Sequence, residues 1–408
     1  VYIIGTVIMA AGAIFSGLSP SLDRMFPSRV LQGVGAAMTQ GTGMAIITAV
    51  FPANEKGRAI GMFMTMVGVG AIAGPAIGGL LVDFFGWRVV FFLTLPLNII
   101  GAVATLWVLR GWTEEKEADR ARFDWLGATL STGVLVALLL AMTIGNKAGW
   151  FSPSIVIAFT AAIGMLGTFI WWELRTSAPM LDLRLFRRKT FSLGISAAFL
   201  TFLGSSAVLF MMPFYLQNVL GYSAKAAGFA VVPGAICMAI MGTVSGVLSD
   251  RFGWRSFTVG GLASSAIGLL ILSFITEDSS LWMVVPALML MNIGMGTFYS
   301  PNSSSVMSSV VVSKYGVVSG FLNLVRNAAN VTSIAFATVI VTTTMASMGF
   351  EPSLEAVRGE AEGVDQAFTL GLRYAFLAMM SIIVVSLTFS ALQPNRIPEP
   401  EPQDTANR

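Results

Sequence analysis

The sequence contains no histidine and a single cysteine, Cys237, which lies inside an apolar run. This excludes metal sites built from histidine and cysteine, disulfides within the chain, and catalysis in which histidine activates serine or cysteine. No other pair of nucleophile and base stands out, and neither does a glycine-rich phosphate loop. An enzyme is therefore not expected, and the sequence predicts neither a cofactor nor a metal.

Charged residues are scarce. They make up 11% of the 408 residues, whereas a soluble domain carries about 25%. Hydrophobic residues make up 55%, and apolar runs of the length that crosses a bilayer recur along the whole chain. Open sheet edges cannot lie in lipid, and the runs are too long for barrel strands. The sequence therefore predicts an all-α, multi-pass membrane protein in a lipid bilayer. The net charge of +3 does not indicate a nucleic-acid partner.

About twelve membrane-spanning helices are expected. They lie near residues 1–18, 28–50, 60–82, 88–109, 125–145, 153–174, 190–217, 226–248, 257–276, 281–305, 316–345 and 369–392. Sixteen lysines and arginines fall on one set of loops and the tail, and six fall on the alternate set. By the positive-inside rule, the first set is cytoplasmic, and Val1 and the C-terminus both lie on that side of the cell membrane.

A glycine stripe marks the span near 60–82. Gly70, Gly74 and Gly78 recur at every fourth residue, Gly79 follows, and Pro75 interrupts the helix beside Gly74. Glycines at this spacing let a second helix approach to backbone contact, and the proline bends the helix. The pattern fits a helix that moves against a partner, and it fits a static packing seam equally well.

The span near 28–50 carries a polar stripe. Arg29, Gln32 and Gln40 share one helical face with Ala36 and Gly43. A charge inside a span is costly and marks a functional candidate, so the stripe is predicted to line a hydrated cavity. The alternative is that Arg29 lies near the outer end and extends to the membrane surface.

A second polar stripe surrounds Arg326. Its members on that span are Asn323, Arg326, Asn327, Asn330 and Ser333, and the preceding span adds Asn292, Tyr299, Asn302 and Ser303. Two neighbouring stripes indicate a hydrated path, although hydrogen bonds between packed helices are the alternative. Methionine and aromatic residues nearby could form an adaptable apolar pocket or simply face lipid and other helices. They are Phe202, Phe210, Met211, Phe214, Met289, Met295 and Phe298.

The segment 246–255, GVLSDRFGWR, connects two spans on the cytoplasmic side. Gly246 permits close helix approach, Asp250 can pair with an arginine or cap a neighbouring helix, and Gly253 allows a tight turn. With Arg251 and Arg255 these residues are predicted to form a charge-locked latch. The alternative is a plain positively charged loop.

Carboxylates are missing from the middle of the membrane. The nearest of the 21 acidic residues are Asp124, Glu173 and Asp250, all at the edges of spans. Proton coupling usually requires a buried titratable group, and these spans supply no obvious one.

Several segments resemble the major facilitator superfamily, specifically its fourteen-span drug:proton antiporters. GAIAGPAIGG (70–79) is similar to the antiporter motif, and RVLQGVG (29–35) is similar to the motif whose arginine is linked to proton movement. The other matching segments are GWRVVFFLTLP (86–96), PMLDLRLFRRKTF (179–191), YLQNVLGYSAKAAGFAVVP (215–233) and the loop segment 246–255. Departures include Thr94, where the family usually has asparagine.

The resemblance implies two helix bundles around a central cavity. It implies an incomplete four-helix bundle at 1–110, a charged loop with two linking helices at 111–175, a six-helix bundle at 176–392 and a disordered cytoplasmic tail at 393–408. The family's first two helices, which often carry the proton-binding acid, would precede Val1. The implied function is proton-coupled efflux of small lipophilic or amphipathic compounds. A proton-independent facilitator and a non-transporting membrane fragment are the alternatives.

Overall fold

The structure, a computed structural model, describes part of the chain. The described residues are 1–50, 70, 74, 77–78, 81–82, 84–108, 124–149, 152–176, 179, 182–311, 315–354, 356–358 and 363–394. They form two compact units. Unit 1 contains Val1–Phe123 and Ser223–Val232, and unit 2 contains Asp124–Tyr222 and Pro233–Arg408. The domain boundaries expected from the loops stay a prediction.

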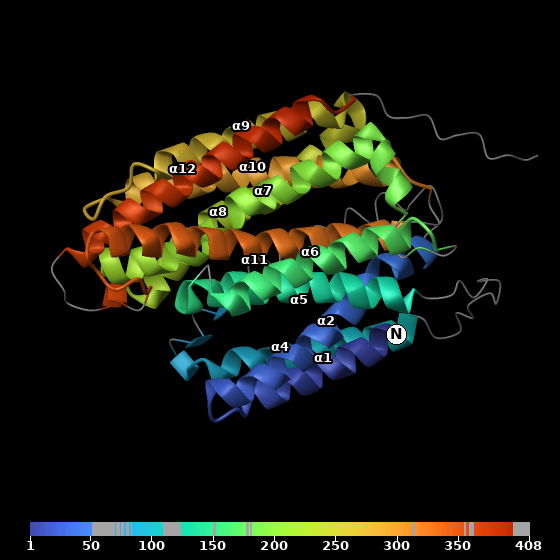
Figure 1. Cartoon of the computed structure of the whole chain (residues 1–408), viewed down its shortest axis with the longest axis horizontal. Helices are drawn as coiled ribbons and strands as arrows, with labels where there is room; N and C mark the ends of the chain where they lie inside the picture. Colours follow the sequence, from blue (N-terminus) through green and yellow to red (C-terminus); the bar gives the residue numbers. More distant parts are fainter. Residues whose placement is uncertain are drawn as a thin grey trace, which may run out of the picture. The chain divides into compact units, whose positions relative to one another are not determined.

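The described residues are almost entirely helical (Figure 1). The long helices are α1 (Tyr2–Gly17), α2 (Leu22–Val50), α4 (Arg88–Val108), α5 (Trp125–Ala148), α6 (Pro153–Glu173), α7 (Lys189–Phe214), α8 (Ala224–Phe252), α9 (Trp254–Leu272), α10 (Leu281–Ser308), α11 (Tyr315–Ser347) and α12 (Val364–Ala391). Short turns are η1 (Leu183–Arg187), η2 (Tyr215–Val219), a π-helical turn that extends α7, and η4 (Ala356–Arg358).

The expected fold class is confirmed. Within the described residues, nine helices are long and apolar enough to cross a membrane, from α4 through α12. Helix α1 is apolar but has only 16 residues, fewer than the roughly 20 that span a bilayer. Helix α2 has 29 residues and carries Asp23, Arg24 and Arg29 in its first half, which lowers its hydropathy.

In unit 1, α1 packs against α2 and α4 through glycines. A Cβ atom built at Gly35 would lie 2.4 Å from the backbone nitrogen of Met9, and one built at Gly12 would lie 2.7 Å from that of Gln32. Gly17 meets the ring of Phe92 on α4. Because glycine has no side chain, these helices approach one another to backbone contact, as other membrane helix pairs do. Figure 1 shows the three helices side by side.

In unit 2, glycines join α9 to α10. A Cβ atom built at Gly294 would lie 2.2 Å from the Ser265 hydroxyl oxygen and 2.3 Å from the Gly261 carbonyl oxygen. The Ser265 hydroxyl donates to the Met291 carbonyl at 2.9 Å across the same seam. On the other side of α10, Gly296 lies against the backbone of Met238 on α8. Helix α10 is therefore held between α8 and α9 at close range.

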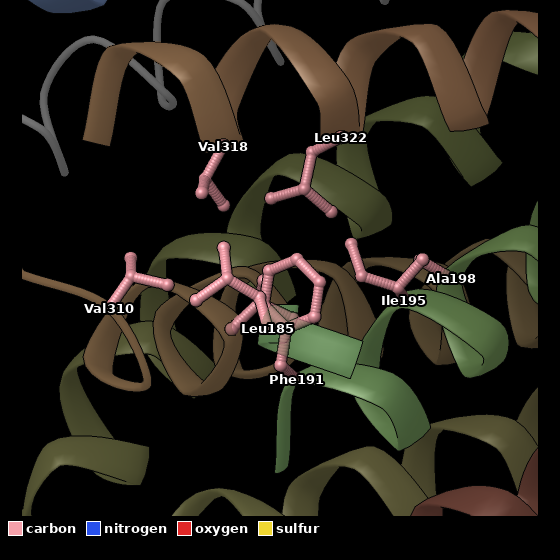
Figure 2. Packing of buried hydrophobic residues seen from close by; sticks show 8 residues of the cluster. Leu185, Phe191, Ile195, Ala198, Val310, Val318 and Leu322 are labelled. Atoms are coloured by element: carbon pink, nitrogen blue, oxygen red, sulfur yellow. The ribbon is translucent and has the colours of Figure 1, made fainter. Parts of the chain in front are cut away.

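The basic turn η1, which precedes α7, packs its apolar side chains against helices of unit 2. Figure 2 shows the cluster that receives it, which draws on η1, α7, α10 and α11. Leu185 and Phe191 are buried in this cluster, and the Phe186 ring meets those of Phe191 and Phe321 edge-on. The other buried members are Ile195, Ala198, Val306, Val310, Val318 and Leu322. Arg184 and Arg187 stay exposed, so the turn is amphipathic.

Candidate transport site

Arg326 lies at the centre of a cation–aromatic cluster inside unit 2. Its Nη1 donates to the hydroxyl of Tyr299 on α10, and its Nε donates to the Leu322 carbonyl at 3.2 Å. The guanidinium carbon lies 4.7 Å from the Tyr299 ring centroid and 5.9 Å from that of Phe202 on α7. The two rings are 6.0 Å apart at an interplanar angle of 75°. Phe202, Tyr299 and Arg326 are called the Arg326 cluster below.

Next to the cluster, hydrogen bonds join α11 to α7. The Ser206 hydroxyl donates to the Asn330 side-chain oxygen, and the Ser333 hydroxyl accepts from the Ala207 backbone nitrogen at 3.0 Å. Asn323 is half-buried and Asn327 is exposed on the same helix. Part of the stripe therefore does bind a neighbouring helix, and part keeps its polar surface open. Exposing amides and a guanidinium to lipid costs free energy. This face of α11 therefore favours contact with water over contact with lipid.

The polar residues of α10 do not all face this cluster. Asn302 is 2% exposed and donates to the Gly194 carbonyl on α7 at 3.1 Å. It also accepts from Gln393, just after α12, at 3.4 Å. Asn302 therefore does not line the hydrated path that the polar stripe predicts, because it is enclosed by the ends of α7 and α12. Asn292 is half-buried and donates to the Leu288 carbonyl of its own helix at 2.8 Å.

The aromatic and methionine residues near the stripe have mixed roles. Met211, Met295 and Phe298 are buried among packed helices, so they face other helices and do not line an open pocket. Phe202 is half-buried and faces Arg326, whereas Phe210 is 38% exposed. The sequence offered no signal that would separate Phe202 from its neighbours, since all of them occupy apolar helices.

The stripe on α2 centres on an Arg29–Gln32 pair. Arg29 Nη1 donates to the Gln32 side-chain oxygen at 2.6 Å, and its guanidinium carbon lies 5.3 Å from the Phe91 ring centroid on α4. Arg29 and Gln40 are exposed, and Gln32 is half-buried. Within the described part of the chain, Arg29 contacts no carboxylate. Its described partners are the side-chain amide of Gln32 and the ring of Phe91.

The glycine stripe is helical and open at its described positions. Within the described part of the chain, no heavy atom lies within 4 Å of a Cβ atom built at Gly70, Gly74 or Gly78. Which helix packs on the stripe stays a prediction. Pro75 and Gly79 lie outside the described residues.

The segment 246–255 ends α8 and starts α9. Gly253 has φ +84°, a conformation that favours glycine, and its nitrogen donates to the Ser249 carbonyl at 2.9 Å. A Cβ atom at Gly246 would lie 2.5 Å from the Ser300 hydroxyl oxygen on α10, so α8 and α10 approach closely there. Arg251 and Arg255 are exposed. The side chain of Asp250 lies outside the described residues.

Two carboxylates converge at one end of the α5–α6 hairpin. Asp124 Oδ1 accepts from the Gly127 nitrogen at 2.8 Å and from Trp172 Nε1 at 2.9 Å, which caps α5. A Cβ atom at Gly127 would lie 2.5 Å from Asp124 Oδ2 and 2.7 Å from Glu173 Oε1. Glu173 is 4% exposed. The sequence placed both acids at span edges, and their meeting could be read only from the antiparallel pairing of the helices.

Helices that are long and apolar enough to cross a membrane, with the cation of Arg326 half-buried among them, define a multi-pass membrane protein. The family model of the Major Facilitator Superfamily matches residues 1–126 and 121–334. The chain belongs to this superfamily, which confirms the resemblance, and it is a transporter-family protein and not an enzyme.

The chain is similar to a multidrug resistance protein and to a riboflavin transporter. The chain is 36% identical over 358 residues to multidrug resistance protein Stp of Mycobacterium tuberculosis (strain CDC 1551 / Oshkosh), covering 87% of this chain and 65% of Stp. It is 30% identical to riboflavin transporter RibZ of Clostridioides difficile (strain 630), covering 82% of this chain and 72% of RibZ. The chain thus spans just under two thirds of the length of Stp.

A solved structure supports the fold. The chain matches a bacterial homologue of the human lysosomal transporter Spinster, crystallised in an inward-facing and occupied conformation. The TM-score is 0.58 at 21% sequence identity, and the match covers 96% of this chain and 81% of the other. At this identity the match establishes the helical architecture alone.

Proposed function

We propose that the protein is a secondary active transporter that exports small amphipathic compounds across the cytoplasmic membrane in exchange for protons. Two helix bundles would alternate access to a central cavity. The observation that carries this proposal is the open polar face of α11 around Arg326, in a helix otherwise apolar enough to span a membrane. The similarity to multidrug resistance protein Stp supports the direction of transport.

Three groups of residues have proposed roles. Arg29, with Gln32 and Gln40, tunes the proton site. The helix carrying the glycine stripe (70–79) slides or seals where the bundles meet. Asp250 with Arg251, turned by Gly253 and followed by Arg255, latches the state that is closed to the cytoplasm. The open surface of the stripe and the positive φ of Gly253 are compatible with these roles.

Transport is tested with the complete protein in inside-out membrane vesicles. A fluorescent amphiphile should accumulate when a proton gradient is imposed, and an uncoupler should abolish the accumulation. Uptake that survives the uncoupler would favour a proton-independent facilitator. No uptake of any of several amphiphiles, by protein that is folded and inserted, would favour the non-transporting alternative.

Riboflavin transport is a second candidate. It is favoured by the similarity to RibZ, of which the chain covers 72%, and by the paired rings of Phe202 and Tyr299, against which a flat heterocycle can pack. Riboflavin added to the same vesicles should then compete with the fluorescent amphiphile. Unchanged amphiphile uptake at saturating riboflavin would contradict this candidate.

Arg29→Ala is expected to lower proton-driven transport at least about tenfold, because an ion site in low-dielectric surroundings depends strongly on nearby charge. Folding should be little affected, since Arg29 is exposed. Initial uptake rates are compared at equal protein levels. The control is Arg24→Ala, which removes an exposed arginine from the same helix outside the stripe. Equal rates in wild type and Arg29→Ala would refute the role given to Arg29.

A further inference from the structure

We propose that the Arg326 cluster selects planar aromatic compounds that carry a negative charge, and that it disfavours lipophilic cations. The inference rests on the proposed transport function and specifies the substrate class of the same site. Three features support it: the net charge of the site, the geometry of the guanidinium, and the aromatic rings beside it.

Within the part of the chain that the structure describes, the charge of the site is positive. In the described helices α7 to α12, each other charged residue lies at most nine residues from the nearer helix end, whereas Arg326 lies eleven residues after the start of α11. Its described contacts are Leu322, Tyr299 and Phe202, none of which carries a negative charge. A cation without a counter-charge attracts an anion and repels another cation, and both effects are larger where the dielectric constant is lower than that of water.

The guanidinium is oriented and still has donors to offer. Nε is fixed by the Leu322 carbonyl and Nη1 by the Tyr299 hydroxyl. Among the described residues, Nη2 has no hydrogen-bond partner, and Nη1 carries a second hydrogen. A planar fork held in this way matches the two oxygens of a carboxylate, sulfonate or phosphate.

The rings supply the second half of the recognition. Phe202 and Tyr299 are half-buried, like Arg326, and meet in an edge-to-face arrangement. A flat ligand can pack against such rings while its acidic group reaches the guanidinium. A lipophilic cation of the same shape would gain the ring contacts but would meet the guanidinium charge.

The experiment compares two dyes that share the xanthene ring system and differ in charge. Binding of fluorescein, an anion, and of rhodamine 6G, a cation, to the purified complete protein in nanodiscs is measured by fluorescence anisotropy. Fluorescein should bind at least about tenfold more tightly. Arg326→Gln should weaken fluorescein binding at least about tenfold and leave rhodamine 6G binding equal or tighter. Arg326→Lys should restore only part of the fluorescein affinity, because lysine keeps the charge and loses the fork.

Two further variants separate recognition from structure. Tyr299→Phe keeps the ring and removes the hydroxyl that orients Nη1, so fluorescein affinity should fall severalfold while rhodamine 6G affinity holds. Arg373→Gln, which removes an arginine near the start of α12 outside the cluster, should change neither affinity. If Arg326→Gln does not fold, the Tyr299→Phe result and the dye preference of the wild type decide.

The proposal is overturned if the wild type binds rhodamine 6G as tightly as fluorescein. It is also overturned if Arg326→Gln weakens both dyes equally, since a purely structural role would do that. The transport proposal fails separately: charge-selective binding without accumulation of fluorescein or of any other amphiphile in energised vesicles would refute transport and leave the selectivity standing. Proton-driven accumulation of rhodamine 6G but not of fluorescein would support transport and refute the selectivity for anions.

Discussion

Gly74→Leu is expected to yield folded, membrane-inserted protein whose transport rate is at least about tenfold below wild type. The rate falls because the helix must approach a partner at backbone distance during transport. Within the described part of the chain, no heavy atom lies within 4 Å of a Cβ atom at Gly74, so the leucine clashes with nothing in its described surroundings. The proposed motion brings a second helix onto the glycine stripe, and there a leucine side chain would hold the helices apart.

Two measurements together test this expectation. Size-exclusion chromatography reports folded protein, and proton-driven uptake in vesicles reports function. The control is Gly101→Leu on α4, where the described surroundings are likewise open but no role in the motion is proposed. Wild-type transport by Gly74→Leu would show that the stripe is not a moving contact. A loss of folded protein would show that it is a static seam.

Gly294→Leu should have the opposite outcome and prevent stable folding. Its Cβ would lie 2.2 Å from the Ser265 hydroxyl oxygen and 2.3 Å from the Gly261 carbonyl, closer than any real contact allows. Helices α9 and α10 would have to separate, at a cost of about 1–3 kcal/mol or more for overpacking. That is a large share of the stability of a typical protein, so little folded protein should remain.

Gly260→Leu provides the matched control for this variant. Gly260 precedes Gly261 on α9, and the described surroundings hold no heavy atom within 4 Å of its Cβ position. Thermal unfolding followed by chromatography should therefore show a wild-type midpoint for Gly260→Leu and a greatly lowered one, or no monodisperse peak, for Gly294→Leu. Equal midpoints for the two variants would contradict the packing at this seam.

These glycines show where the sequence was informative. Gly70, Gly74 and Gly78 stand out in the sequence by their regular spacing, yet the structure leaves them open on the described side. Gly261 and Gly294, two of the glycines that are in tight contact, lie on different helices, so spacing along one helix does not pair them. Sequence spacing reveals a smooth face on one helix. It does not reveal which helix occupies that face, because this depends on contacts between distant segments.

The Arg326 site shows the same division. The sequence placed Arg326 inside a span and Tyr299 on the preceding one, and the structure brings these two side chains together. It also put Asn302 on the face of Tyr299, but Asn302 is enclosed by α7 and the end of α12. Phe202 emerged as a partner of Arg326 only from the structure.

The sequence by itself determined that the chain is helical and membrane-embedded, because a backbone in lipid must satisfy its hydrogen bonds within each segment, and long apolar runs leave helices as the solution. It also indicated that a few polar groups, Arg29 and Arg326 among them, need water or hydrogen-bond partners. Tertiary structure alone decided how each helix is rotated. These helices are apolar around most of their circumference, so periodicity does not select an inward face, and close packing against neighbours sets it.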